Sequence, residues 1–450
     1  MFISRLMKHI NLLLLFTIIF IGTKTFSQTK AISLSQAISM ATEKNTQMIN
    51  SRNAVESQES FQRVAYGALF PSVSASGNWR RSQNKSGFAL NDFSAGIDAN
   101  ITFFDGFSNF AALERAQLNV ETSKLTRERQ HQQTTYTTIS LYLNVLRTEQ
   151  LLNVRKDNLK RSNEQLKRIQ ESQKLGGVAI ADVYRQQVIV SNDELASIQA
   201  QNDFDKAKVD LTSFLTLDPN EQYEFSDSYC SFGSSEQYEF SDSSIPTDVD
   251  SMEIQNGKNQ EQNLNTLSSQ AMSTRFDYIT SQKTVKGLEL GVRYAEGDWW
   301  PTLSAFAGIG YGGRELGKTT YTGLDWGIRA SYPLFNNFQR ENSVQQAKID
   351  LRNADEALDA KERQVKSDVR KAVLDLDAAR KSLEVSQTAV RSAIEDRRIA
   401  EEKYNLGAGT LLDKLVADAN YTSAISNKVN SVYNYILAKR DLEFVVGTLK

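Results

Sequence analysis

Apolar and polar residues alternate strictly in two short stretches of the chain. In residues 92–104, apolar side chains occupy every second position, and small or polar residues occupy the positions between them. The same period recurs in residues 324–332. A period of two over about eleven residues is typical of a tilted strand that crosses a membrane with one face toward lipid. A less regular apolar stretch precedes each strand, so we predict β-hairpins at 71–104 and 301–335.

The longer segments of the chain have an apolar period of seven instead. The positions are Val145, Leu152, Leu159 and Leu166 in the first half, and Leu376, Leu383 and Val390 in the second. A sustained seven-residue period indicates coiled-coil packing. We predict helices at 33–66, 109–175, 178–217, 262–297, 339–405 and 410–446, and all five prolines lie outside them. At 1.5 Å per residue the two longest helices would be roughly 100 Å long, so they must pack lengthwise against other helices.

The two halves of the chain are copies of one unit. Gly67 recurs as Gly297, 230 residues later, and Asp182 recurs as Asp413 at an offset of 231. Each unit consists of a helix, a β-hairpin, a long helix, a glycine turn and a shorter helix. Chance matches do not keep a constant offset over about 110 residues, so the repeat indicates a duplicated fold with nearly equal helix lengths.

The duplication and the N-terminus divide the chain into segments. We predict a signal peptide at 1–27, a first repeat at 28–217, a linker at 218–261 and a second repeat at 262–450. The linker is rich in Ser, Asp, Glu and Gln and contains the sequence EQYEFSDS twice. A tandem duplication and a functional motif both account for that doublet.

The N-terminal segment has the order of charges and apolar residues that marks a secreted protein. Arg5 and Lys8 precede an apolar run at 10–22, which is shorter than the roughly 20 residues of a membrane-spanning helix. We predict cleavage near Ser27, with an uncleaved anchor as the alternative. Since no other stretch is apolar enough for a membrane-spanning helix, any membrane crossing must use β-strands.

Composition excludes several classes of protein. The 450 residues carry a net charge of −2, so the chain is not a basic nucleic-acid binder. Cys230 is the only cysteine, which excludes an intramolecular disulfide or a thiolate metal cluster. The two histidines, His9 and His131, are too few for a histidine metal site or a convincing catalytic triad. Because no nucleotide loop, metal cage or nucleophile is present, we expect no enzyme activity and no cofactor.

Four strands are too few to close a membrane barrel, whose minimum is about eight. A soluble sheet with one wet face is the alternative, and it would need a helix to cover its apolar side. In lipid, several chains must share one barrel: two chains give eight strands, and three give twelve with room for a pore. Six aromatic residues cluster at the strand ends nearest the helices, as in an interfacial girdle that contacts lipid: Phe103, Phe104, Trp299, Trp300, Tyr332 and Phe335.

Taken together, these features resemble the TolC-like outer membrane efflux proteins over essentially the whole mature chain. The resemblance depends on the repeat, the strands and two turn sequences, LGGVAIADV at 175–183 and YNLGAGTLLDKL at 404–415. It implies an α+β membrane protein that forms a homotrimer, with a twelve-stranded outer membrane barrel continuous with an α-helical periplasmic tunnel. The linker at 218–261 would then lie in the equatorial belt of the tunnel.

The resemblance also implies a function and its partners. The chain would be the exit duct of a tripartite efflux or type I secretion system in the outer membrane of a Gram-negative bacterium. Its helical tips would meet a periplasmic adaptor and an inner membrane pump, which supplies the energy. Drugs, metals and proteins all remain possible as cargo. An elongated coiled-coil structural or adhesive surface protein is the alternative, and it predicts heptads but not four alternating strands.

The resemblance places a periplasmic gate at the two turns. Asp182 and Asp413 match acidic residues of the family's entrance, and Tyr404 matches a tyrosine that helps to keep it closed. The turn glycines of this candidate gate are Gly176, Gly177, Gly407 and Gly409.

The candidate gate departs from the family at two positions, where Gly409 replaces an arginine and Val416 replaces a second aspartate. We therefore expect a different closing contact and a thinner acidic ring. The plainer interpretation of both aspartates is helix stabilisation, because a carboxylate is favoured near a helix N-terminus.

Overall fold

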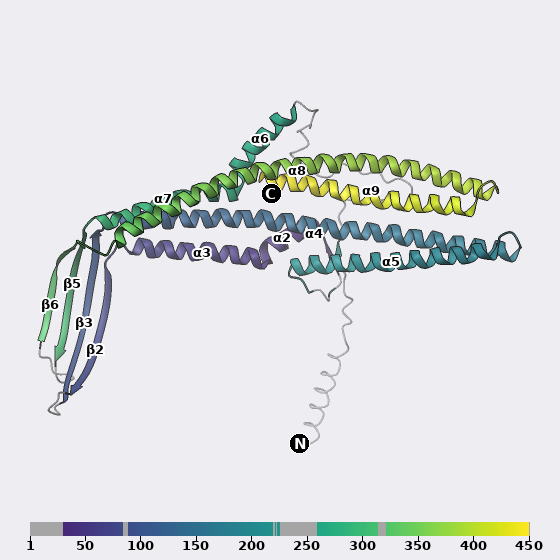
Figure 1. The fold of residues 1–450 in the computed structure, drawn as a ribbon. Helices are drawn as coiled ribbons and strands as arrows, with labels where there is room; N and C mark the ends of the chain where they lie inside the picture. Colours follow the sequence, from purple (N-terminus) through teal and green to yellow (C-terminus); the bar gives the residue numbers. More distant parts are fainter. Residues whose placement is uncertain are drawn as a thin grey trace, which may run out of the picture.

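The computed structural model describes residues 30–83, 89–218, 221, 223–225, 259–313 and 321–449. The predicted signal peptide, Cys230 and most of the predicted linker lie outside these ranges. The described chain is an elongated helical body with a β-sheet at one end and two helical turns at the other (Figure 1). None of the helices in these ranges is both long enough and apolar enough to span a bilayer.

Two long helices run from the sheet to the far end of the molecule. They are α4 (Ser108–Lys174) and α8 (Gln339–Asn405), each of 67 residues, close to the predicted 109–175 and 339–405. The shorter helices α5 (Ile180–Phe214) and α9 (Leu411–Val446) fold back against their far halves (Figure 1). The predicted pairs of one long and one shorter helix, joined by a glycine turn, are therefore confirmed as α4–α5 and α8–α9.

The remaining helices lie nearer the sheet, and here the prediction was wrong in one respect. The expected single helices at 33–66 and 262–297 are each broken in two, as α2 (Leu34–Lys44) and α3 (Thr46–Gly67), and as α6 (Asn259–Thr274) and α7 (Phe276–Glu296). The breaks fall at Asn45 and Arg275, whose backbones are extended. Neither break has a proline or glycine to signal it. A short turn, η3 (Gly297–Trp299), follows α7.

Four antiparallel strands form the sheet. They are β2 (Ser72–Gln83), β3 (Ala89–Phe104), β5 (Thr302–Gly313) and β6 (Tyr321–Ser331), in the spatial order β2-β3-β5-β6. The strands occupy the predicted hairpins, although β6 ends at Ser331, two residues before Pro333. Consequently β2 and β6 are the edges, and each has one side without a partner strand among the residues that the structure describes.

The strand register places apolar residues on one face of the sheet in all four strands. One row across it is Ala75, Ile97, Ile309 and Leu324, and the adjacent row on the opposite face is Ser74, Asp98, Gly308 and Asp325. The predicted alternation is therefore confirmed. Trp326 is 78% exposed and Ile328 is 74% exposed, because no described helix covers the sheet (Figure 1). A soluble sheet would need a helix over its apolar face, and no described helix lies there.

The apolar core of the helical body lies midway along it. Tyr142 on α4 is fully buried, donates to the Ile32 carbonyl at 3.0 Å, and meets the Phe225 ring edge to face at 5.9 Å. Ile32 and Phe225 belong to a short parallel pair, β1 (Lys30–Ile32) and β4 (Tyr223–Phe225). Of the predicted heptad positions, Val145 and Val390 are buried in this core. The linker thus begins with a strand that attaches it to the core.

Candidate functional site

The two predicted gate turns lie together at the end of the molecule opposite the sheet (Figure 1). Gly176 has φ +77° and Gly407 has φ +69°, a conformation that side chains disfavour. In each turn the third residue after the helix donates a backbone hydrogen bond to the last helical turn: Gly177 to the Ser172 carbonyl and Ala408 to the Lys403 carbonyl, both at 2.9 Å. The glycines therefore end α4 and α8 sharply and return the chain.

Gly409 has no side chain, and little room exists for one. A Cβ atom there would lie 3.0 Å from Cβ of Lys403 and 3.3 Å from the Tyr404 nitrogen. A side chain at this position would make close contact with the last turn of α8, which would have to move slightly. Gly409 therefore belongs to a tight turn.

Asp413 stabilises the start of its own helix. Its carboxylate accepts from the Thr410 hydroxyl at 2.7 Å and from the Thr410 nitrogen at 3.0 Å, and the Asp413 nitrogen donates to that hydroxyl. These bonds from Thr410 hold the pKa of Asp413 below its usual range. The arrangement is a capping box at the N-terminus of α9.

Asp182 also interacts with its own helix. It lies in the first turn of α5, where it pairs with Arg185 at 2.7 Å, and both side chains are partly exposed. Asp182 and Asp413 therefore both interact within their own helix starts, Asp182 with Arg185 and Asp413 with Thr410, and no described contact joins the two aspartates. The helix-stabilising interpretation holds for both, and a second role at the entrance remains a proposal.

Tyr404 lies between the two helical hairpins. The tips share a small apolar cluster whose buried members are Ile169, Val183 and Leu411, from α4, α5 and α9. Tyr404 of α8 packs against this cluster, together with Leu166, Val178 and Leu415. The candidate gate is thus a packed contact between the first and second repeats.

Lys414 is a tip residue that the sequence analysis did not identify. Its side chain is 7% exposed, and Nζ donates to Gln165 Oε1 at 3.0 Å and to Glu401 Oε1 at 3.4 Å. The ammonium also lies 5.5 Å from the centre of the Tyr404 ring. The only signal in the sequence was the repeat, because Lys414 is the counterpart of the apolar Val183.

A further polar contact between the repeats lies about two turns deeper in the helical body. Thr422 of α9 donates to Asn158 Oδ1 of α4 at 2.8 Å, and Asn158 donates to Asp193 of α5 at 2.7 Å. Nearby, Asp418 lies 4.0 Å from Arg397. Burial raises the pKa of Asp418, while the positive charges of Lys414 and Arg397 partly oppose that rise.

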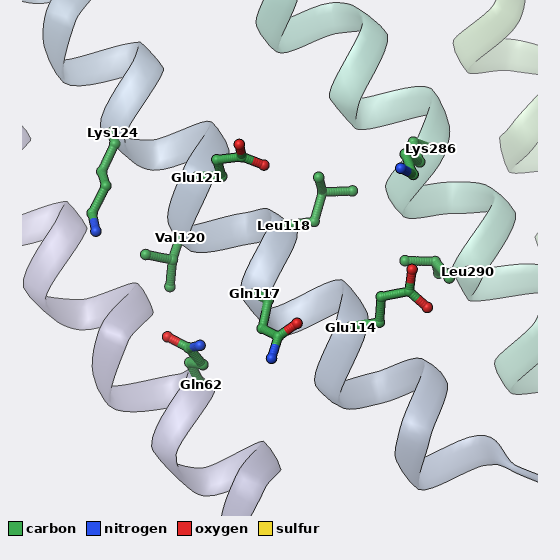
Figure 2. Close-up of a pocket in the computed structure, with 9 residues that line it drawn as sticks. All are labelled: Gln62, Glu114, Gln117, Leu118, Val120, Glu121, Lys124, Lys286 and Leu290. Carbon is green, nitrogen blue, oxygen red and sulfur yellow. The ribbon is translucent and has the colours of Figure 1, made fainter.

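A groove near the sheet is a second candidate, and it is less convincing. It measures about 430 Å³ and lies between α3, α4 and α7, as the side chains in Figure 2 show. Glu121, on its wall, pairs with Lys283 at 2.8 Å, and Lys124 pairs with Glu59 at 3.3 Å. Glu121 and Lys124 are therefore already paired, and Glu114 and Lys286 are the other charged side chains that line the groove.

An uncovered apolar sheet at one end of a long double helical hairpin defines the class of an outer membrane channel protein. The chain belongs to the outer membrane efflux protein family, whose model matches residues 37–216 and 267–448. The two matched segments correspond to the two repeats. The chain is therefore an efflux duct of the outer membrane that extends into the periplasm, and its family consists of transporters.

Individual relatives are distant but cover most of the chain. The outer membrane protein TolC of Escherichia coli K12 is 22% identical over 417 residues, which is 88% of this chain and 79% of TolC. The outer membrane efflux protein BepC of Brucella suis is 20% identical over 420 residues, which is 91% of this chain and 84% of BepC.

Solved structures have the same fold. The Campylobacter jejuni CmeC outer membrane channel superposes with a TM-score of 0.77 at 17% identity, covering 92% of this chain and 85% of that one. The open state of the Neisseria gonorrhoeae MtrE outer membrane channel gives 0.74 at 18% identity, covering 93% and 89%.

Proposed function

We propose that three copies of this chain form one channel, which is the passive exit duct of a tripartite efflux system. A partner pump in the inner membrane supplies the energy, and a periplasmic adaptor joins that pump to the helical tips. The chain itself binds no cofactor and carries out no chemistry. The observation that carries this proposal is the four-stranded sheet with two open edges and an uncovered apolar face.

The open edges of the sheet require partner strands. In lipid, each backbone N–H or C=O group on the open side of β2 or β6 that lacks a hydrogen-bond partner would cost roughly several kcal/mol. The edges must therefore pair with the strands of another copy. Two copies would supply eight strands, and the interior of an eight-stranded barrel is filled by side chains. Three copies supply twelve strands, with the polar row that includes Asp98 and Asp325 facing a water-filled lumen.

The internal repeat supports a ring of chains and suggests which surfaces meet. Within the chain, the end of α7 packs against the start of α4: Ser108 Oγ donates to the Tyr294 carbonyl at 3.0 Å, and a Cβ on Gly297 would overlap that hydroxyl. The equivalent of Gly297 is Gly67 on α3, where a Cβ would meet no atom within 4 Å. The end of α3 therefore fits the start of α8 in the next copy.

Two substitutions at Gly67 test this assembly. Gly67→Trp fills open space in the single chain, so we expect each protomer to fold while trimers fail to form in the outer membrane. Gly67→Ala adds only a methyl group at the same position, so it is the small-residue control and should assemble normally. Heat-resistant trimers on gel electrophoresis and conductance of the purified protein in planar bilayers give the readout. Normal trimers and normal conductance for Gly67→Trp would contradict the proposed docking.

We further propose that the tips form the periplasmic entrance of the duct. In a trimer the three pairs of Asp182 and Asp413 would line it and favour cations. Leu175 and Leu406, which are 88% and 83% exposed at the two turns, give the adaptor an apolar contact.

A further inference from the structure

Arg340 has a buried guanidinium group without a carboxylate partner. It lies in the first turn of α8 and is 6% exposed. Its Nη2 donates to the Pro333 carbonyl at 2.9 Å, and its Cζ lies 4.9 Å from the centre of the Trp299 ring and 5.3 Å from that of Tyr332. Among the residues that the structure describes, Nε has no hydrogen-bond partner. Since a buried charge is costly unless an opposite charge compensates it, this site lacks an anion.

The acidic residues nearby do not supply that anion. Glu341, the next residue of α8, and Asp298, in η3, both have exposed side chains. Neither is a partner of Arg340 in the described part of the chain. Glu296 pairs with Lys348 instead, at 3.3 Å. The positive charge of Arg340 therefore has no counter-ion within its own chain.

The first repeat shows what the second one lacks. In α4 the equivalent of Arg340 is Asn109, whose nitrogen donates to the Asp105 carboxylate at 3.0 Å. The equivalent of Asp105 is Asn336, which carries no charge. The N-cap residue of α8, Phe338, provides no side-chain hydrogen bond either. The second repeat thus replaces an internal carboxylate with an amide and adds a guanidinium at a helix N-terminus, and both changes favour an external anion.

The surroundings of Arg340 indicate where that anion comes from. Tyr332 continues the alternation of Trp326 and Ile328, which lie on the apolar face of the sheet, at the end where the chain enters the helices. Tyr332 is 47% exposed and Trp299 is 45% exposed. Aromatic rings in such positions lie at the headgroup level of a membrane. Because the helices extend into the periplasm, the anions at this level are the phosphates of phospholipids in the periplasmic leaflet.

A second copy of the chain would not supply the anion. The docking proposed above brings the end of α3 to the start of α8 in the next copy. Residues 61–72, which form that end, contain Arg63 and no acidic residue. Such a contact adds positive charge near Arg340, so a lipid phosphate is needed whether or not the chains assemble.

We propose that Arg340 and the start of α8 bind the phosphate of one phospholipid per chain. The guanidinium donors that Pro333 leaves unused, together with backbone nitrogens of the first helical turn, bind the phosphate oxygens. Trp299 and Tyr332 hold the guanidinium between their rings, and their exposed parts contact the lipid below its headgroup. The site fixes the depth of the chain in the membrane at the point where strands give way to helices.

Binding of phosphatidylglycerol by the full-length protein tests this site. Delipidated protein in detergent is titrated with phosphatidylglycerol, and native mass spectrometry counts the lipids bound per chain. A hydrogen bond to a charged group shifts an equilibrium by about tenfold or more, so we expect Arg340→Met to weaken the tightest binding step by that factor. Arg352→Met removes an exposed arginine about three turns further along α8 and is the matched control, with wild-type binding expected.

Asn336→Asp is a second variant, and it keeps Arg340 in place. It restores the carboxylate that the first repeat has at the equivalent position, so the anion would come from within the chain. We expect this variant to bind phosphatidylglycerol as weakly as Arg340→Met, without loss of thermal stability. Wild-type affinity for phosphatidylglycerol in both variants would overturn the site.

Inorganic phosphate separates the two possible sources of the anion. A lipid also contacts the aromatic rings, so an excess of inorganic phosphate should leave phosphatidylglycerol bound to the wild-type protein. Displacement of the lipid by inorganic phosphate would show a site for free anions and would overturn the assignment to a phospholipid.

Discussion

Asn45 and Arg275 occupy equivalent places in the two repeats, and each ties a helix break to the end of the last helix of its repeat. Asn45 Nδ2 donates to the Phe214 carbonyl at 3.2 Å, and Arg275 Nη1 donates to the Val445 carbonyl at 3.5 Å. Both residues end one helix and begin the next, and each donates a hydrogen bond to a carbonyl at the end of a different helix, where the last carbonyls have no partner within their own helix. The same joint is thus built from an amide in one repeat and from an ion-pair network in the other.

The joint at Arg275 should contribute more to stability than the joint at Asn45. Arg275 has a 4% exposed side chain that pairs with Asp277 at 2.8 Å and with Asp368 at 3.2 Å. Removing one partner of a buried ion pair costs about 3–5 kcal/mol, whereas loss of a capping side chain costs about 1 kcal/mol. In urea unfolding followed by circular dichroism, Arg275→Ala should therefore have a lower free energy of unfolding than Asn45→Ala. Arg370→Ala, at an exposed arginine of α8, is the control; equal losses for Arg275→Ala and Asn45→Ala would contradict the ranking.

This network also predicts a loss of stability in acid. Burial alone would raise the pKa of Asp277, but hydrogen bonds from Arg275 and Lys361 outweigh it and hold that pKa well below its usual range. A depressed folded-state pKa gives stability that is present above the unfolded-state pKa, and this stability is lost as the pH falls through the folded-state value. Asp277→Asn should therefore destabilise the protein near pH 7, and the difference from wild type should shrink in strong acid. A difference that is constant with pH would exclude this linkage.

Asp441 should show the opposite sign. Burial raises its pKa, and the hydrogen bond from Tyr136 opposes that rise only in part. A raised folded-state pKa gives stability that is present below the unfolded-state pKa and is lost as the pH rises through the folded-state value. Asp441→Asn keeps an acceptor for Tyr136, so we expect it to stabilise the protein at neutral pH and to have no such effect in acid. Unfolding midpoints at both pH values test this; a destabilised variant at neutral pH would contradict it.

Two glycine substitutions should change stability in opposite directions. Gly407 has a positive φ, so Gly407→Ala should destabilise the second turn by about 1–2 kcal/mol. Gly287 lies inside α7, where an added Cβ would make an ordinary 3.5 Å contact with Leu118. Gly287→Ala should therefore stabilise the protein by about 0.5–1 kcal/mol. Thermal unfolding of the two variants tests the sign of each change, and a shift in the same direction for both would contradict the account.

The proposed acidic entrance predicts a change in ion selectivity. Asp413→Asn removes a negative charge but retains an oxygen that can cap α9, so the tip should stay folded. The ratio of cation to anion permeability, measured from reversal potentials in a salt gradient, should then fall toward one. Asp157→Asn, at an exposed position along α4, is the control and should leave the ratio unchanged. An unaltered ratio for Asp413→Asn would show that the residue only caps its helix.

The regular elements could be predicted from the sequence because their signals are local and occur twice. The 67-residue helix α8 was predicted at 339–405, since a seven-residue period runs through it and a glycine turn ends it. The breaks at Asn45 and Arg275 were missed because both depend on side-chain bonds to carbonyls about 170 residues away. The burial of Lys414 was missed for a similar reason: a lysine beside an aspartate resembles any solvated helix start.

The mass of the complex extracted from outer membranes tests the central claim most directly. Native mass spectrometry of the full-length protein, released from its detergent micelle, counts the chains that share the four-stranded sheets. The account predicts a complex of three chains, which supplies twelve strands and leaves an open lumen. A stable complex of two chains, or a single chain in the membrane, would contradict it.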